Sequence, residues 1–305
     1  MRAPAGEPVP VTPDLLRSMP LPRHQEGQDK DERGRVLVVA GSVEVPGGAL
    51  LCGIGALRAG AGKLQIATCR SVAPHLAVAV PEARVSGLDE TPGGGISADE
   101  ADRLAERAGR CDALLLGPGM MDRDGEAAAL ARRLLERMEA GPGVVLDAAA
   151  LPDLRDGETV LRRHAGRVVL TPHSGEMATL LGVSKDEVEA DRLAAARRAA
   201  AALGAVVAMK GGNTFVVGPQ GEAWDCDRGN IGLATSGSGD TLAGVIAGLI
   251  ARGADPVRAT VWGVFLHGEA GNRLARKQGP VGFLAREMLA EIPPIMAEME
   301  AGAAG

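Results

Sequence analysis

Aromatic side chains are almost absent from this chain of 305 residues, which has three Phe, two Trp and no Tyr. The core must therefore be built from aliphatic side chains. Hydrophobic residues make up 46% of the sequence and charged residues 24%, the balance of an ordinary globular protein. Cysteine is scarce too. The four cysteines include no CxxC pair, so a zinc-type spacing is excluded and buried thiols in a reducing cytosol are favoured.

Long apolar runs, targeting signals and an excess of positive charge are lacking as well. The formal net charge is −6 at pH 7, which argues against a nucleic-acid partner or a polybasic membrane patch. Residues 1–23 contain no apolar stretch of the kind that marks a signal peptide. The longest weakly charged run, Gly47–Cys69, contains Arg58, Lys63 and several glycines, which is unsuitable for a membrane span. We therefore expect a cytoplasmic protein without a membrane or nucleic-acid partner.

Several widespread catalytic motifs are missing. There is no GxxxxGK[ST] sequence, which excludes a P-loop nucleotide site. The glycine pairs Gly53–Gly55 and Gly60–Gly62 lack the third glycine of a dinucleotide-binding fingerprint. Neither GxSxG nor HExxH occurs, so a serine-hydrolase elbow and a zinc-protease helix are excluded.

The chain does contain an alternation of short apolar runs with helical patterns. Strands are predicted at 35–41, 63–68, 113–119, 143–151, 167–176, 205–212 and 214–218. Helices are predicted at 49–60, 125–141 and 184–204. A further helix is predicted within Gly229–Gly253, and two more follow it before the C-terminus. The strands are continuous apolar runs, as expected when both faces of a sheet are covered. This pattern predicts one α/β domain over residues 1–305, with a mostly parallel sheet between two helix layers.

Polar and glycine residues gather where the predicted strands end. They are Gly41–Ser42, Gly117–Gly119, Asp147, Thr171–His173, Lys210–Thr214 and Gly237–Asp240. Ligands of open α/β sheets bind beyond the carboxyl ends of the strands. Six such turns at successive strand ends predict a single crevice.

One carboxylate stands at the start of a very apolar helical run, in the stretch Gly229–Gly253, GNIGLATSGSGDTLAGVIAGLIARG. The first turn of a helix offers unpaired N–H groups and a positive dipole end, and Gly237 and Gly239 would let an anion approach them closely. Asp240 could simply stabilise that dipole. Beside an anion site, however, the acid is suited to accept a proton from a substrate hydroxyl while the amides hold a phosphoryl group.

This stretch resembles the GxGD signature of the ribokinase-like superfamily and, more narrowly, that of the ADP/ATP-dependent NAD(P)H-hydrate dehydratases. Four further segments are similar to that family in order and spacing: Val36–Thr68, LLLGPGM at Leu114–Met120, LTPHSGE at Leu170–Glu176 and KGGNTFVV at Lys210–Val217. The resemblance runs from about residue 21 to 294. It departs from the family at Gln28–Gly34, where a Ser-His-Lys-Gly stretch is usual, and at Ser238, where Thr or Gly is usual.

The resemblance implies a ribokinase-like fold and a repair reaction. A nucleotide phosphorylates the C6 hydroxyl of the S-form of NADH or NADPH hydrate, and loss of phosphate restores NAD(P)H. Asp240 would be the base for the hydroxyl, and the amides of Gly237, Ser238 and Gly239 would hold the phosphoryl group. Mg²⁺ would be bound through phosphates and water, without a dedicated protein site.

The resemblance also implies binding residues for both substrates. Those on the nucleotide side would be Lys210, Gly211, Gly212, Asn213, Thr214 and Gly239. Those on the hydrate side would be Gly48, Gly119, His173 and Asp240. Asn230 and Asp147 are further candidates for a magnesium or phosphate contact.

Alternatives stay open at this point. A ribokinase-like kinase for a vitamin precursor, of the hydroxyethylthiazole or hydroxymethylpyrimidine type, would share the GxGD chemistry and end with a phosphorylated product. A nucleotide sensor that had lost the chemistry is disfavoured by the intact Asp240. The stand-alone form favours ADP over ATP and does not decide between NADH and NADPH hydrate. The resemblance further implies a homo-oligomer, a tetramer in the family, and a separate epimerase, since the roughly 35 residues before the first strand are too few for an epimerase domain.

Overall fold

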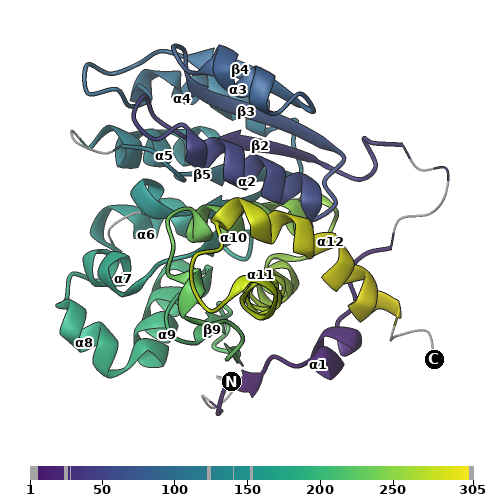
Figure 1. The fold of residues 1–305 in the computed structure, drawn as a ribbon. Helices are drawn as coiled ribbons and strands as arrows, with labels where there is room; N and C mark the ends of the chain where they lie inside the picture. The colour runs from purple at the N-terminus through teal and green to yellow at the C-terminus, as the bar shows by residue number, and fades with distance from the viewer. Residues whose placement is uncertain are drawn as a thin grey trace.

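A computed structural model describes residues 6–23, 27, 29–121, 125–139, 141–151 and 154–301 (Figure 1). Its strands are β1 Val9–Pro10, β2 Arg35–Val39, β3 Lys63–Cys69, β4 Ala83–Leu88, β5 Ala113–Leu116, β6 Gly143–Leu146, β7 Val168–Leu170, β8 Val206–Met209, β9 Thr214–Val217 and β10 Ala223–Cys226. They form a ten-stranded sheet in the order β1-β10-β9-β8-β7-β6-β5-β2-β3-β4. Neighbouring strands are parallel except at the β8–β9 and β9–β10 pairs, which are antiparallel.

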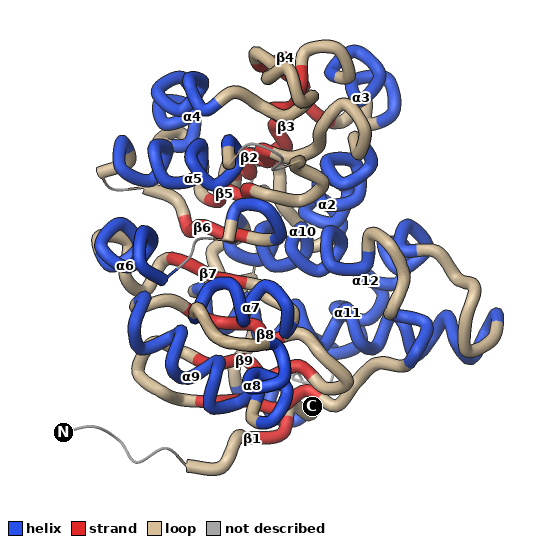
Figure 2. The backbone as a smooth tube through the Cα atoms, turned by 90° about the vertical axis from the view of Figure 1, so that its left-hand side faces the viewer, coloured by secondary structure: helices blue, strands red, loops and turns tan. Residues whose placement is uncertain are grey.

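Helices cover both faces of the sheet, as predicted (Figure 2). One face packs against α2 Gly47–Arg58, α10 Ser238–Ala251, α11 Pro256–Gln278 and α12 Ala285–Ala301. The other packs against α4 Ala101–Ala108, α5 Glu126–Arg137, α6 Leu154–Arg162, α7 Ser174–Leu181, α8 Lys185–Ala190 and α9 Arg192–Leu203. Helices α1 Pro13–Ser18 and α3 Ala73–Ala79 and the 3₁₀ turns η1 Ala98–Glu100, η2 Ala148–Ala150 and η3 Ile231–Leu233 complete the described elements.

Strand β2 shows why the sheet needs both layers. Its side chains alternate between two separate cores, with Val36 and Val38 in one and Leu37 and Val39 in the other. All four are fully buried. A strand buried on both faces has no polar side to alternate with, which accounts for the continuous apolar runs in the sequence.

Some predicted boundaries were wrong. The strand predicted at 143–151 ends at Leu146, because Asp147 leaves the ladder and Ala148 turns with a positive φ of 49°. The helix predicted at 184–204 is two helices, α8 and α9, because Asp191 between them has a non-helical backbone and caps α9. Ser184 caps α8 through its hydroxyl, which accepts the Glu187 amide. Strands β1, β4 and β10 were not predicted, since they are short or polar.

Helices α2 and α10 lie side by side in unusually close contact. A Cβ at Gly244 would come 2.2 Å from Cys52 O, and one at Gly248 would come 2.3 Å from Ala56 O. The second contact lies one helical turn after the first in both helices, so the two helices run parallel. Their N-termini therefore lie at the same end, where β2 delivers the chain into α2. Among the described helices, none is both long and apolar enough to cross a membrane, and the apolar run of α10 is buried in this helix layer.

Candidate active site

Four of the six predicted strand-end turns contribute to a cavity of about 880 Å³ at the carboxyl edge of the sheet, whereas Gly41–Ser42 and Gly117–Gly119 are not among its lining residues. The segments after β6 and β7, the β8–β9 turn, η3, α10 and α11 all contribute to its wall. Ten predicted residues line it: Asp147, His173, Lys210, Gly211, Gly212, Thr214, Asn230, Ser238, Gly239 and Asp240. Its size suits a ligand larger than a single small metabolite.

Asp240 lies in the first turn of α10 and has an unusual acidity. Burial and, to a smaller extent, the nearby Asp147 carboxylate raise its pKa to about 6, and Lys210 opposes both. An acid that only stabilised a helix dipole would have its pKa lowered by that dipole. Asp240 is therefore a carboxylate that can take up a proton near neutral pH, which is what a general base requires.

The turn before α10 leaves amides free at the cavity wall. Gly237 holds a left-handed backbone with φ 86° and caps the helix without a side-chain hydrogen bond. The Ser238 amide donates to Thr235 O at 3.2 Å. Within the part of the chain that the structure describes, the amides of Gly239 and Asp240 have no acceptor. An anion placed here would meet two free N–H groups at the positive end of a 14-residue helix.

Lys210 places a positive charge beside this turn. Its Nζ lies 3.0 Å from Asp147 Oδ1 and 3.6 Å from Glu176 Oε2. Burial lowers the pKa of Lys210, but the carboxylates of Asp147 and Glu176 outweigh burial, so its pKa is raised. A Cβ built on Gly239 would lie 3.4 Å from Nζ, so the ammonium group stands directly next to the amides of the turn. The Asp147 carboxylate also accepts the Thr171 hydroxyl at 2.6 Å.

The predicted turn after β8 contributes four of its five residues to the cavity wall, Lys210, Gly211, Gly212 and Thr214. Asn213 is not among the lining residues. Its side-chain amide donates to Asp225 Oδ1 at 2.6 Å, and its oxygens accept hydrogen bonds from Arg192. Arg192 also explains Gly211, since a Cβ there would come 1.5 Å from the guanidinium.

His173 lines the cavity and also begins α7. Its Nδ1 accepts the amides of Gly175 at 3.0 Å and Glu176 at 3.2 Å, and Glu176 Oε2 accepts the His173 amide at 2.8 Å. This is a capping box in which an imidazole takes the place of a hydroxyl. With Nδ1 used as an acceptor, the ring hydrogen of a neutral His173 is on Nε2, which lies 3.4 Å from Glu176 Oε1.

Gly48 and Gly119 lie against each other, apart from the residues that line this cavity. A Cβ on Gly48 would come 2.8 Å from the Gly119 backbone, and one on Gly119 would come 2.6 Å from Val45 O. Both glycines are therefore required by backbone packing. They lie at the N-terminus of α2, at the same end of the helix pair as the N-terminus of α10.

The predicted Asn230 and several residues that were not predicted complete the wall. Asn230 caps η3, accepting the Gly232 amide at 2.9 Å, and donates to Asn272 at 3.1 Å. Not predicted were Ala148, Glu176, Ile231, Leu233, Ala234, Thr235, Leu242 and His267. Glu176 could have been found, because it ends the LTPHSGE segment. His267 could not, because it lies inside an apolar helix without a motif.

The charges of the cavity suit an anionic ligand that brings its own cation. Asp147, Glu176 and Asp240 face one ammonium group, Lys210. Among the described residues, no three His, Cys, Asp or Glu side chains are arranged to hold a metal ion. A magnesium ion carried by nucleotide phosphates fits this set, because it offsets the charge between phosphates and carboxylates without needing a protein cage.

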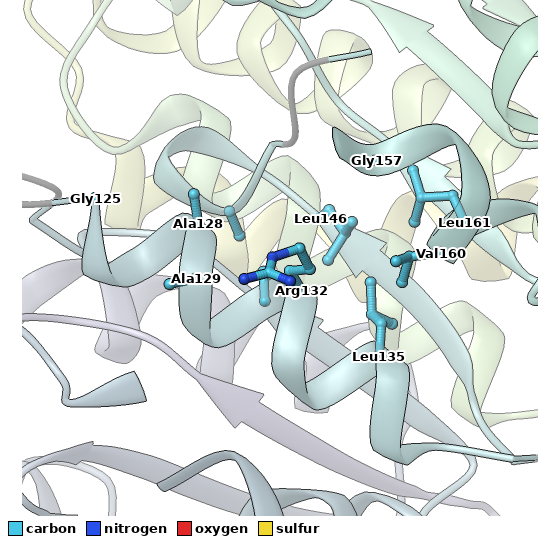
Figure 3. A pocket seen from close by; sticks show the side chains of 11 residues that line it. Gly125, Ala128, Ala129, Arg132, Leu135, Leu146, Gly157, Val160 and Leu161 are labelled. Carbon is cyan, nitrogen blue, oxygen red and sulfur yellow. The ribbon is translucent and has the colours of Figure 1, made fainter. Parts of the chain in front are cut away.

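A second cavity, of about 260 Å³, lies between α5 and α6 (Figure 3). Its wall is apolar, with Leu135, Leu146 and Val160 in it, apart from Arg132. Arg132 pairs with Glu136 on the same helix at 3.1 Å. Among the described residues that line it, there is no acid, histidine or thiol that could act as a base or nucleophile. The larger cavity is therefore the candidate active site.

Comparison with known proteins agrees with this geometry. Residues 36–294 match the family model described as NAD(P)H-hydrate dehydratase. The chain belongs to this family. The ADP-dependent (S)-NAD(P)H-hydrate dehydratase of Xanthomonas campestris is 49% identical to it over 294 residues, which are 96% of this chain and 97% of that protein. The family resemblance seen in the sequence is thereby confirmed.

Two further relatives bear on the family's organisation. The bifunctional NAD(P)H-hydrate repair enzyme of Moorella thermoacetica is 40% identical over 280 residues, 92% of this chain and 52% of that enzyme. The solved structure of the Bacillus subtilis ADP/ATP-dependent NAD(P)H-hydrate dehydratase, crystallised with ATP and Mg²⁺, superposes with a TM-score of 0.80 at 29% identity. That match covers 96% of this chain and 99% of the other. The predicted three-layer, ribokinase-like fold is confirmed.

Proposed function

We propose that this protein is an ADP-dependent NAD(P)H-hydrate dehydratase, a carbon–oxygen lyase of metabolite repair. It consumes (S)-NADH or NADPH hydrate and ADP and releases NAD(P)H, AMP and phosphate. The observation that carries the proposal is Asp240, a carboxylate with a pKa of about 6, next to two free helix amides and Lys210. The family match supports a dehydratase over a vitamin-precursor kinase.

The geometry supports a division of labour in the first step. Asp240 takes the proton of the C6 hydroxyl, and the hydroxyl oxygen attacks the terminal phosphorus of the nucleotide. The bond from that phosphorus to the AMP oxygen breaks, and AMP leaves. The Gly239 and Asp240 amides and Lys210 stabilise the charge on the transferred group. A magnesium ion bound with the nucleotide would supply further neutralisation of phosphate charge, and Asp147 and Asn230 are the candidate protein contacts for it.

The second step needs no further cofactor. The C6–O bond breaks, phosphate leaves with the bonding electrons, and a proton is lost from C5, so that the ring double bond is restored. The amides that received the phosphoryl group now hold the leaving phosphate. The start of α10 therefore serves both steps.

We assign the two substrates to different sets of residues around Asp240. The Lys210–Thr214 turn would hold the nucleotide phosphates, with Asn213 contributing backbone only, because Arg192 and Asp225 occupy its side chain. Gly48, Gly119 and His173 would hold the hydrate. Asn230 and Asp147 would act from the wall, Asp147 by holding Lys210 in place.

Location and assembly stay predictions. A cytoplasmic location is supported by the four cysteines, which are buried and unpaired. One domain with a core at about 21–294, a homo-oligomer and a separate epimerase are the further expectations. Light scattering of the purified protein would measure the subunit number. Assays of the R-form of the hydrate, with and without an added epimerase, would test whether a separate epimerase is needed.

The test of function is a product analysis. Purified protein is mixed with (S)-NADH hydrate, Mg²⁺ and either ADP or ATP. We expect the near-ultraviolet absorbance of NADH to return in proportion to AMP and inorganic phosphate, measured by phosphorus NMR. A stable phosphorylated product without renewed absorbance would instead identify a kinase. Faster turnover with ATP than with ADP would show that ATP is the nucleotide substrate.

A further inference from the structure

His267 is a polar side chain of the cavity wall that no motif and no step above uses. It lies inside α11, next to Leu266 and Phe265, which are 0% and 1% exposed. Its Nε2 lies 2.9 Å from Ser238 Oγ and 3.1 Å from Ser238 O. Both His267 and Ser238 line the large cavity. A polar ring beside these apolar side chains needs hydrogen-bond partners, and Ser238 supplies two.

The two contacts determine where the ring proton sits. A carbonyl oxygen can only accept, so Ser238 O is a partner of Nε2 only if Nε2 carries hydrogen. With the proton on Nδ1, Nε2 and Ser238 O would oppose lone pair to lone pair at 3.1 Å. Burial lowers the pKa of His267 to about 4, so the ring is neutral at pH 7 and has one N–H. That N–H is therefore shared between the carbonyl and the hydroxyl oxygen of Ser238.

This arrangement leaves the Ser238 hydroxyl hydrogen unused. Because Oγ accepts from His267, its own hydrogen must point elsewhere. Ser238 opens α10, one residue before the free amides of Gly239 and Asp240. The His267 hydrogen bond fixes the orientation of the Ser238 hydroxyl, so its hydrogen can be donated to an anion bound at the start of α10.

We propose that His267 is a positioning residue that holds Ser238 so that its hydroxyl donates a hydrogen bond to the phosphoryl group transferred at the start of α10. The assignment rests on the function proposed above and deepens it. His267 does not touch the substrate and exchanges no proton. It acts through Ser238, which replaces the Thr or Gly usual at this position of the family.

The test compares ADP with AMP, because only ADP carries the transferred group. Isothermal calorimetry with Mg²⁺ measures the affinity of both nucleotides for wild type, Ser238→Ala, His267→Leu and the double variant. We expect each single variant to weaken ADP binding about 10-fold, the usual value of a hydrogen bond to a charged group, and to leave AMP binding unchanged. The double variant should lose no more than either single one, since both remove the same hydrogen bond.

Two further variants separate positioning from packing. His267→Gln keeps an N–H donor near Nε2 and should bind ADP within about threefold of wild type. His164→Gln is the matched control, because His164 is a buried histidine that is likewise bonded through Nε2, to Leu135 O at 2.8 Å, and lies away from the large cavity. It should lower the melting temperature without changing ADP affinity. If His267→Leu does not fold, His267→Asn, which is too short to reach Ser238, replaces it.

Two outcomes would overturn the proposal. One is additive losses of ADP affinity in the double variant, which would mean that His267 acts independently of Ser238. The other is equal loss for AMP and ADP, which would make His267 a packing residue of the site as a whole. A wild-type protein that bound ADP but regenerated no NADH would instead refute the proposed function, and the calorimetric comparison would still decide the role of His267.

Discussion

Lys210 Nζ lies 3.0 Å from Asp147 Oδ1 at the carboxyl edge of the sheet, and the Asp147 side chain is only 2% exposed. The pair joins the residues that directly follow β6 and β8, which are 63 positions apart in the sequence. It places a cation beside the anion-binding turn and keeps a buried carboxylate near Asp240. The ligand site and the stability of this edge therefore depend on the same ion pair.

Lys210→Ala should affect both properties at once. Removing the ammonium group leaves the Asp147 carboxylate buried with only the Thr171 hydroxyl, which costs about 3 kcal/mol of unfolding free energy. It also removes a charge from phosphate recognition and should raise the KM for ADP at least about tenfold. Adding Asp147→Asn should recover most of the stability and none of the ADP affinity. Recovery of both would mean that Lys210 does not contact the nucleotide.

The pH profile should report Asp240. A base with a pKa of about 6 must be ionised to act, so kcat/KM should fall about tenfold per pH unit below pH 6 and level off above pH 7. Asp240→Asn should lower turnover about 10²- to 10⁴-fold and remove this limb of the profile, while ADP binding stays within a few fold. Steady-state kinetics from pH 5 to 8.5 check it. A wild-type profile that is flat through pH 6 would contradict the assignment.

The same substitution should stabilise the protein at neutral pH. Asp240 binds its proton more tightly when folded, with a pKa of about 6, than at the usual aspartate value of 3.8. Between about pH 4 and 6 the folded state holds more protons, so the unfolding free energy falls as pH rises, and the loss is complete above pH 6. Urea unfolding of Asp240→Asn should therefore show a gain over wild type at pH 7.5 that disappears by pH 4. A variant less stable than wild type at pH 7.5 would show that the carboxylate mainly stabilises the helix.

Gly239 and Gly244 should respond differently to the same added methyl group. A Cβ at Gly239 meets only Lys210 Nζ at 3.4 Å, an ordinary contact, so Gly239→Ala should fold normally and lose ADP affinity because the methyl group faces the phosphoryl site. At Gly244 a Cβ would come 2.2 Å from Cys52 O, and backbone cannot yield cheaply. Gly244→Ala should therefore lower the unfolding free energy by about 1–3 kcal/mol. Thermal unfolding and ADP calorimetry of both variants measure the contrast, and wild-type ADP affinity in Gly239→Ala would place the phosphoryl group elsewhere.

Two substitutions of His173 should distinguish its role as the N-cap of α7 from its proposed role in binding the hydrate. His173→Ala removes the acceptor for two amides at the start of α7 and should cost about 1 kcal/mol of stability. His173→Asn restores an N-cap acceptor and should recover that stability, but neither variant offers Nε2 to the hydrate. Both should raise the hydrate KM or lower kcat, with ADP affinity little changed. Loss of ADP affinity with an unchanged hydrate KM would reverse the proposed division of the cavity.

Local patterns in the sequence were enough to predict the layers of this fold and most of the strand-end residues that line its large cavity. Buried parallel strands must be apolar along their whole length, helices between them must end at glycines and caps, and an anion site at a helix N-terminus needs glycines such as Gly237 and Gly239. These requirements concern residues that are close together in the sequence, so short segments are enough to reveal them. Missing motifs likewise excluded other nucleotide sites without any structure.

Tertiary structure decided what those residues can do. The pKa of Asp240 depends on burial and on Asp147, the proton of His267 is placed by Ser238, and Asn213 is turned from the cavity by Arg192. Each of these effects joins groups that are distant in the sequence. Electrostatic and hydrogen-bond energies depend on the distance between atoms and on the exclusion of water, and both are set only when the sheet brings its strand ends together.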